Sequence, residues 1–88
     1  MSAIATYGRP GLTQTLAYSA SPATSEPIGS QTYRVRLVAT TAALVSIGDA
    51  VGMYLAPNFP EVFLTSPGQS VTVTQFAAAG QLALTELE

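Results

Sequence analysis

The sequence contains no histidine, cysteine, tryptophan or lysine, and its three basic residues are all arginines. General acid–base catalysis relies mainly on His, Glu, Asp, Lys, Tyr and Cys, so five carboxylates and four tyrosines are all that remain for it. Disulfides and most zinc sites are excluded with the missing thiols and imidazoles. The spacing of the separated carboxylates does not favour a glycosidase pair, and Asp49 beside Gly48 is typical of a turn. We expect no catalytic residue, no metal site and no cofactor.

Charge is also scarce, since only 9% of the residues are charged and 48% are hydrophobic. An ordinary soluble domain has about 25% charged residues. A domain of 88 residues buries only roughly 60–65% of the surface that its unfolded chain exposes. Partner subunits are the remaining way to stabilise it, so we expect a homo-oligomer.

The net charge of −2 without lysine argues against nucleic acid and against an anionic membrane as partners. No apolar stretch approaches the roughly 20 residues of a membrane-spanning helix. The first ten residues also lack the basic segment and apolar run of a signal peptide. We expect a protein made in a cytoplasm and not exported, with no small-molecule substrate.

From Gln31 onward, apolar and polar residues alternate with the period of two that is typical of half-buried strands. Ser66-Pro67-Gly68-Gln69 predicts a type II turn, because proline fixes the first central residue and glycine supplies the positive φ of the second. The pattern predicts an all-β fold, either a small antiparallel β-sandwich or a jelly-roll-like barrel. The inward-facing residues are expected to be Tyr33, Val35, Leu37, Ala39, Ala43, Val45, Ile47, Val71, Val73, Leu82 and Leu84.

The first 30 residues differ, since prolines, glycines and small polar residues predominate there. We predict an extended N-terminal arm over residues 1–12, followed by the β-sandwich domain over 13–88. Residues 13–20 are predicted as a strand and 26–28 as a short edge strand. The arm is either a disordered terminus or a segment that orders on a neighbouring subunit.

Two large residues, Phe76 and Leu87, fall out of phase with their strands. Either a bulge restores the phase, or these side chains face outward into a partner. Arg34 and Arg36 share one strand face. They are either solvated, or paired within the chain with Glu61 and Glu86 as the natural partners, or docked on an acidic neighbour. Asp49 and the remaining carboxylates suggest no further site.

The aromatic residues Tyr54, Phe59 and Phe63 are read as core or interface residues, with stacking on a sugar as the alternative. The candidate subunit contacts are Tyr7, Arg9, Tyr18, Arg34, Arg36, Tyr54, Phe59, Phe76 and Leu87.

The strands resemble a family of small proteins encoded among the head genes of tailed bacteriophages. The match covers about residues 31–87 and depends on the order and spacing of weak motifs. It departs after Gly48, where relatives often carry a longer Thr/Ala-rich insertion. The motifs are Tyr33-Arg34-Val35-Arg36-Leu37-Val38-Ala39-Thr40-Thr41, Ile47-Gly48, Met53-Tyr54-Leu55, Pro60-Glu61-Val62-Phe63, Pro67-Gly68-Gln69-Ser70-Val71, Ala79-Gly80 with Leu82, and Thr85-Glu86-Leu87.

This resemblance implies a β-sandwich virion component without catalytic residues, of the kind taken to be a decoration or cement protein on the capsid surface. The expected partners are the major capsid protein and further copies of the chain in a small oligomer, with a trimer as the first candidate. The expected location is the capsid surface of the virion. The alternative is a tail or head-fibre component that binds a host receptor or glycan.

Overall fold

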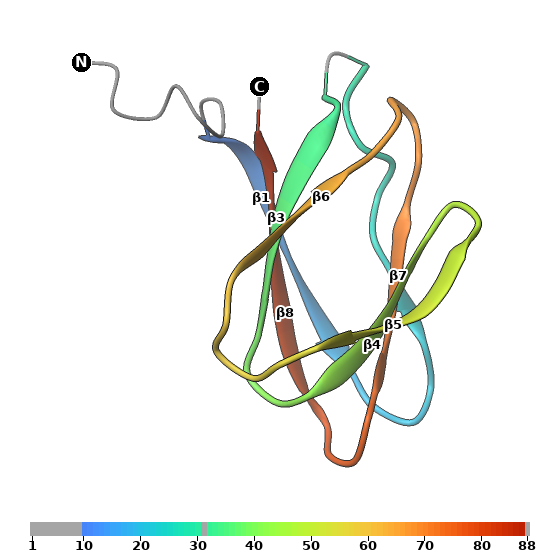
Figure 1. Cartoon of the computed structure of the whole chain (residues 1–88), viewed down its shortest axis with the longest axis vertical. Coiled ribbons are helices and arrows are strands. Elements are labelled where there is room, and N and C mark those ends of the chain that lie inside the picture. Colours follow the sequence, from blue (N-terminus) through green and yellow to red (C-terminus); the bar gives the residue numbers. More distant parts are fainter. Residues whose placement is uncertain (1–9, 31, 88) are drawn as a thin grey trace.

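The computed structural model describes residues 10–30 and 32–87, in which every regular element is a β-strand. The strands form two antiparallel sheets of four, which we call sheet A (β1-β8-β3-β6) and sheet B (β2-β7-β4-β5). In Figure 1, β1, β3 and β8 lie to the left of β4, β5 and β7. The strands are β1 (Pro10–Tyr18), β2 (Ala23–Thr24), β3 (Arg34–Ala39), β4 (Ala43–Ile47), β5 (Ala50–Leu55), β6 (Glu61–Leu64), β7 (Val71–Gln75) and β8 (Gly80–Leu87).

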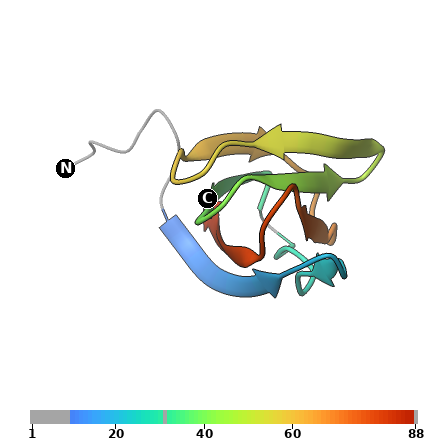
Figure 2. The same ribbon diagram turned by 90° about the horizontal axis from the view of Figure 1, so that it is seen from below.

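The strand order is that of a jelly roll. β1 pairs with β8, β2 with β7, β3 with β6 and β4 with β5, which is the nesting of one long hairpin whose tip is the β4–β5 turn. Rolling this hairpin up adds the β3–β8 and β4–β7 pairs and closes two sheets. Seen from below, β1 (blue) and the β5–β6 segment (yellow to orange) lie on opposite sides (Figure 2). The predicted all-β fold is confirmed.

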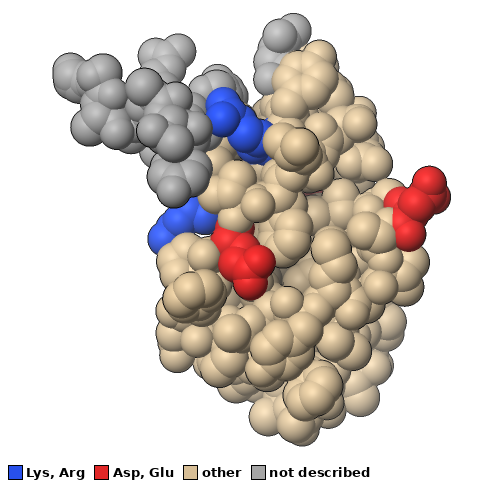
Figure 3. All heavy atoms as spheres, viewed as in Figure 1, with Lys and Arg blue, Asp and Glu red and all other residues tan. Residues whose placement is uncertain are grey.

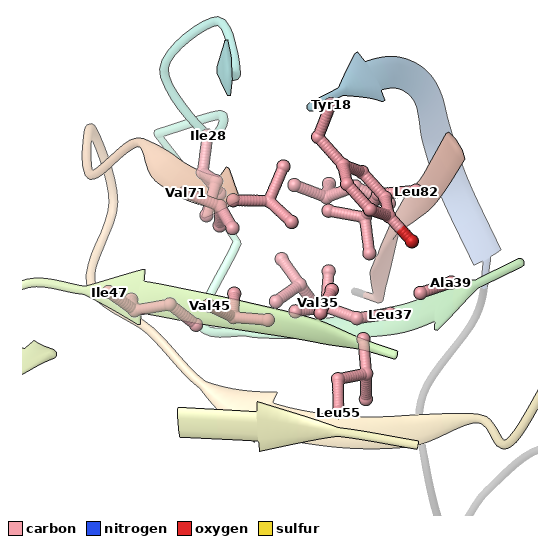
Figure 4. Packing of buried hydrophobic residues seen from close by; sticks show 13 residues of the cluster. Tyr18, Ile28, Val35, Leu37, Ala39, Val45, Ile47, Leu55, Val71 and Leu82 are labelled. Carbon is pink, nitrogen blue, oxygen red and sulfur yellow. The ribbon is translucent and has the colours of Figure 1, made fainter. Parts of the chain in front are cut away.

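The core lies between the two sheets and is formed by the inward face of each strand. The predicted inward-facing residues are buried, with one exception: Tyr33 precedes β3 and is exposed. Leu37 and Val45, which belong to different sheets, are fully buried, and Figure 4 labels both among the core residues. Each large aliphatic side chain in such a position contributes about 1.5–3 kcal/mol of transfer free energy.

The N-terminal third differs from its prediction in two places. β1 begins at Pro10, which pairs with Leu87, so Pro10–Leu12 belong to sheet A and not to an arm. The remainder of the predicted arm, residues 1–9, lies outside the described residues. A register shift falls between Pro10 and Thr13, so the irregularity expected near Leu87 is on β1 rather than on β8.

The short strand predicted over residues 26–28 is wrong, because the second strand is Ala23–Thr24. Proline at position 27 has no N–H to donate, so no regular ladder can continue through it. The segment nevertheless stays beside the start of β7, since the amides of Ser25 and Ile28 donate to Val71 O and Gln69 O, both at 2.8 Å. The Gln14 side chain also bonds the backbone N–H and C=O of Glu26, which ties the segment to β1.

The predicted turn at residues 66–69 is confirmed. The Gln69 amide donates to Ser66 O at 3.1 Å, and Gly68 has a φ of 84°. That φ favours glycine at the second central position of a type II turn.

One buried hydroxyl ties three segments together at the end of the molecule opposite β1's start. Tyr18 Oη donates to Thr41 O at 2.7 Å and accepts from Thr41 N at 3.2 Å. Thr41 Oγ1 in turn donates to Ala78 O at 3.0 Å. A Cβ on Gly80 would lie 2.7 Å from Tyr18 Oη and 2.5 Å from Thr41 Oγ1, so only glycine fits there. We call this group the Tyr18 clamp.

We expect Tyr18→Phe to lower the free energy of unfolding by about 1–2 kcal/mol, because it leaves the backbone groups of Thr41 without their partner. Tyr33→Phe removes the same hydroxyl from an exposed ring and should cost less than about 0.5 kcal/mol. Urea denaturation of both variants measures the difference. Equal losses would show that the clamp does not contribute.

Candidate functional site

The carboxylates of the described residues do not gather into a site. No group of three His, Cys, Asp or Glu side chains that could hold a metal ion occurs among them. Within the same residues, no helix has the length and apolar character to cross a membrane. Glu26 and Asp49 are exposed and Glu61 is half-buried, whereas Glu86 is 3% exposed.

Glu86 lies on the inward face of β8, in phase with Leu82 and Leu84. Its Oε1 accepts from Thr32 Oγ1 at 2.7 Å and from the Gly29 amide at 3.4 Å. A buried carboxylate needs such donors, because it has lost its hydration. The Glu86 carboxylate therefore holds Gly29 and Thr32 in the segment that leads into β3.

The predicted pairing of Glu86 and Glu61 with the two arginines is wrong for a geometric reason. Cross-strand neighbours share a sheet face. Glu86 pairs with Val35 and Glu61 with Leu37, both of which point into the core. The arginines point to the opposite, outer face of sheet A, where their β6 neighbours are Leu64 and Val62.

Charge is confined to one of the two sheets. Every charged residue in a described strand belongs to sheet A, and the strands of sheet B contain none. Figure 3 shows the blue arginine atoms on one side of the molecule and tan atoms over most of the face in view. The two outer faces therefore suit partners of different chemistry.

The outer face of sheet B carries two exposed aromatic rings. Tyr54 on β5 is 53% exposed and Phe76, directly after β7, is 59% exposed. Their ring centroids lie 5.3 Å apart at an interplanar angle of 84°, an edge-to-face contact. Leu44, opposite Tyr54, is half-buried beside them. We call Leu44, Tyr54 and Phe76, with the neighbouring hydroxyl residues Ser46, Thr72 and Thr74, the aromatic face.

Phe76 faces outward without a bulge. The β4–β7 register is regular, and the Phe76 amide continues it by donating to Ala42 O at 3.1 Å. The side chain follows Thr72 and Thr74 on the solvent side of the sheet. Of the two explanations offered by the sequence, the outward one holds for Phe76.

The remaining candidate contacts are dispersed. Arg34 is half-buried and Arg36 exposed, while Phe59 is exposed in the β5–β6 connection. Tyr18 belongs to the core, and Leu87 is only 5% exposed, so neither offers much surface to a partner. Tyr7 and Arg9 lie outside the described residues.

Two of the aromatic candidates differ in burial. Phe63 packs against the core, as the first interpretation had it, whereas Phe59 does not.

Sequence reasoning missed four exposed apolar residues, Leu12, Val51, Val62 and Leu64. Leu64 is 81% exposed at the end of β6. The alternation of β6 could have predicted the exposure of Leu64. With Phe63 facing inward, Val62 and Leu64 lie on the other face of a strand with period two.

No protein-family model, no curated protein and no solved structure matches this chain.

We expect Glu86→Leu to be less stable than Glu86→Gln by about 1–3 kcal/mol. Both substitutions remove the charge, but only glutamine keeps an acceptor for the buried Thr32 hydroxyl. Adding Thr32→Val to the leucine variant should restore most of the loss, because both polar partners are then gone. Thermal and urea unfolding measure this, and a double variant no better than Glu86→Leu would contradict the assigned contact.

A double-mutant cycle of Tyr54→Thr and Phe76→Thr should give a coupling free energy of about 0.5–1.5 kcal/mol from the ring contact. A cycle of Tyr33→Thr with Phe76→Thr is the control. It should be additive within about 0.5 kcal/mol, because Tyr33 precedes β3 in the other sheet. Additivity in both cycles would mean that the two rings do not interact in solution.

Proposed function

We propose that this protein is a structural component of a tailed-bacteriophage virion, a decoration or cement protein that binds the major capsid lattice and stabilises it. The observation that carries the proposal is the aromatic face: two exposed rings on a sheet without charge. Exposed aromatic residues are enriched at protein interfaces, and charged residues are depleted from interface centres. In this proposal the chain has no catalytic role and uses no cofactor or nucleic acid.

The size of the chain sets the demands on such an interface. A stable interface buries about 800 Å² on each partner, which is about a sixth of the 4962 Å² surface of this chain. The two rings of the aromatic face supply only part of that area. Additional contacts from other copies of the chain, arranged as a trimer or another small oligomer, and from residues 1–9 fit this need.

A binding module for a host receptor or glycan is the second candidate. Its supporting observation is that Tyr54 and Phe59 are both exposed, and that hydroxyl residues share the aromatic face with Tyr54. An aromatic ring beside hydroxyl groups suits a neutral sugar, which has an apolar ring face and polar edges.

The test is to add the purified chain to shells of the cognate major capsid protein that lack it, and to follow co-sedimentation and the temperature of DNA release. We expect saturable binding and a higher release temperature. The double variant Tyr54→Thr/Phe76→Thr should weaken binding at least about tenfold, as for interface hot spots. Deletion of residues 1–9 tests the arm and leaves β1 intact.

Leu12→Thr is the matched control, because it removes an exposed apolar side chain from β1 instead. The capsid proposal fails if the wild-type chain does not bind the shell. Binding to host-surface polysaccharide that is lost in the aromatic double variant would then favour the receptor module.

A further inference from the structure

Among the strands that the structure describes, β6 is outermost in sheet A and pairs on one side only, with β3. A strand in this position leaves a row of backbone N–H and C=O groups open on its other side. Four strands of the fold, β1, β2, β5 and β6, end a sheet in this way.

The other three edges are interrupted and β6 is not. A register shift breaks the pairing of β1 with β8, and another breaks that of β5 with β4. β2 has only two residues. The register of β6 against β3 is regular over its whole length. Bulges and very short strands are the devices by which proteins blunt an edge, so β6 is the edge best suited to accept a further strand.

The hydrogen-bond phase of β6 can be fixed from one contact. The Thr65 amide donates to Tyr33 O at 2.8 Å, so residues 33 and 65 form a hydrogen-bonded pair. Bonded and non-bonded pairs alternate in an antiparallel ladder. Val62 and Leu64 therefore occupy non-bonded pairs, and their N–H and C=O groups point away from β3. Within residues 10–30 and 32–87, no other strand pairs with β6.

The side chains beside this open edge combine apolar and cationic groups. Leu64 is 81% exposed and Val62 is 37% exposed, both on the outer face of sheet A. Arg36 lies across from Val62 on the same face and is exposed. An added strand would lie about 4.8 Å beyond β6. Its residue opposite Val62 would extend the row Arg36–Val62, within reach of the long arginine side chain.

The charge of Arg36 indicates which kind of segment the added strand is. Pairing with β6 of a second copy would place Val62 or Leu64 opposite Val62. It would bring no carboxylate of β6 to Arg36, because Glu61 is on the inward side. A segment with a carboxylate at this position would instead meet Arg36 in a charge-assisted contact.

We propose that the open edge of β6 binds an extended acidic segment of another protein as a fifth strand of sheet A, with a carboxylate opposite Val62 and an apolar residue opposite Leu64. Backbone hydrogen bonds to Val62 and Leu64 supply the affinity, and Arg36 selects for negative charge. This inference is independent of the virion proposal, since it concerns a different surface and does not depend on where the protein works.

The test is an NMR titration of the labelled full-length chain with a capped peptide that alternates threonine on one face with glutamate, valine and glutamate on the other. We expect shifts centred on the amides of Val62 and Leu64, and at least tenfold slower hydrogen exchange there. The same peptide with lysine for glutamate should bind about tenfold more weakly. Raising the salt concentration should reduce this preference.

Two variants distinguish the contribution of backbone hydrogen bonds to peptide binding from that of the Arg36 charge. Leu64→Pro removes an outward N–H without removing a bond to β3, so binding should be lost while the fold is kept. Arg36→Gln should bind both peptides alike. If Leu64→Pro unfolds the chain, the wild-type chain is titrated instead with an acidic peptide N-methylated on the edge that faces β6. This peptide should not bind.

Three results would overturn the proposal. They are an unchanged spectrum around Val62 and Leu64 at millimolar acidic peptide, equal affinity for the lysine peptide, and protection of these two amides in a self-associated chain without peptide. The last result would assign the edge to a second copy.

Discussion

The position of β8 between β1 and β3 is the constraint on which the rest of the structure depends. β8 is the last of the described strands, and among these strands it is the only partner of β1 and one of the two partners of β3. It also brings Leu82 and Leu84 into the core and Glu86 onto the segment before β3. Sheet A cannot close until the end of the chain has joined its beginning. Such non-local pairing is characteristic of slow-folding β proteins.

The division of charge between the sheets follows from the same topology. Because consecutive strands of the rolled hairpin usually cross from one sheet to the other, residues close in sequence end on different surfaces. Arg36 and Leu44 are near each other in the chain, yet one faces solvent from sheet A and the other from sheet B. The molecule thus has a neutral, aromatic side and a side that carries its described cations.

Local pattern predicted the fold class, the inward faces of β3, β4, β7 and β8 and the Ser66–Gln69 turn, because each depends on neighbouring residues. Local pattern failed where the pairing of strands that are distant in sequence determines which residues join a sheet. Residues 26–28 follow β7 without forming a strand, and Pro10 joins sheet A because Leu87 pairs with it. The inward position of Glu86 was readable from its phase with Leu84, but its charge argued for solvent. Only the donors of Thr32 and Gly29, far away in sequence, explain its burial. The contact between Tyr54 and Phe76 likewise depends on β5 and β7 flanking β4.

The register partnership of Pro10 and Leu87 places both described ends of the chain on one pole of the roll, while the Tyr18 clamp closes the other pole (Figure 1). Neighbouring ends make a domain suitable for circular permutation, since a short linker can join them without crossing the core. The exposed tip of the β4–β5 hairpin, Gly48-Asp49, is the natural place for new ends. The outer face of sheet B lies away from the pair of Pro10 and Leu87, so joining the chain there would leave that face uncovered.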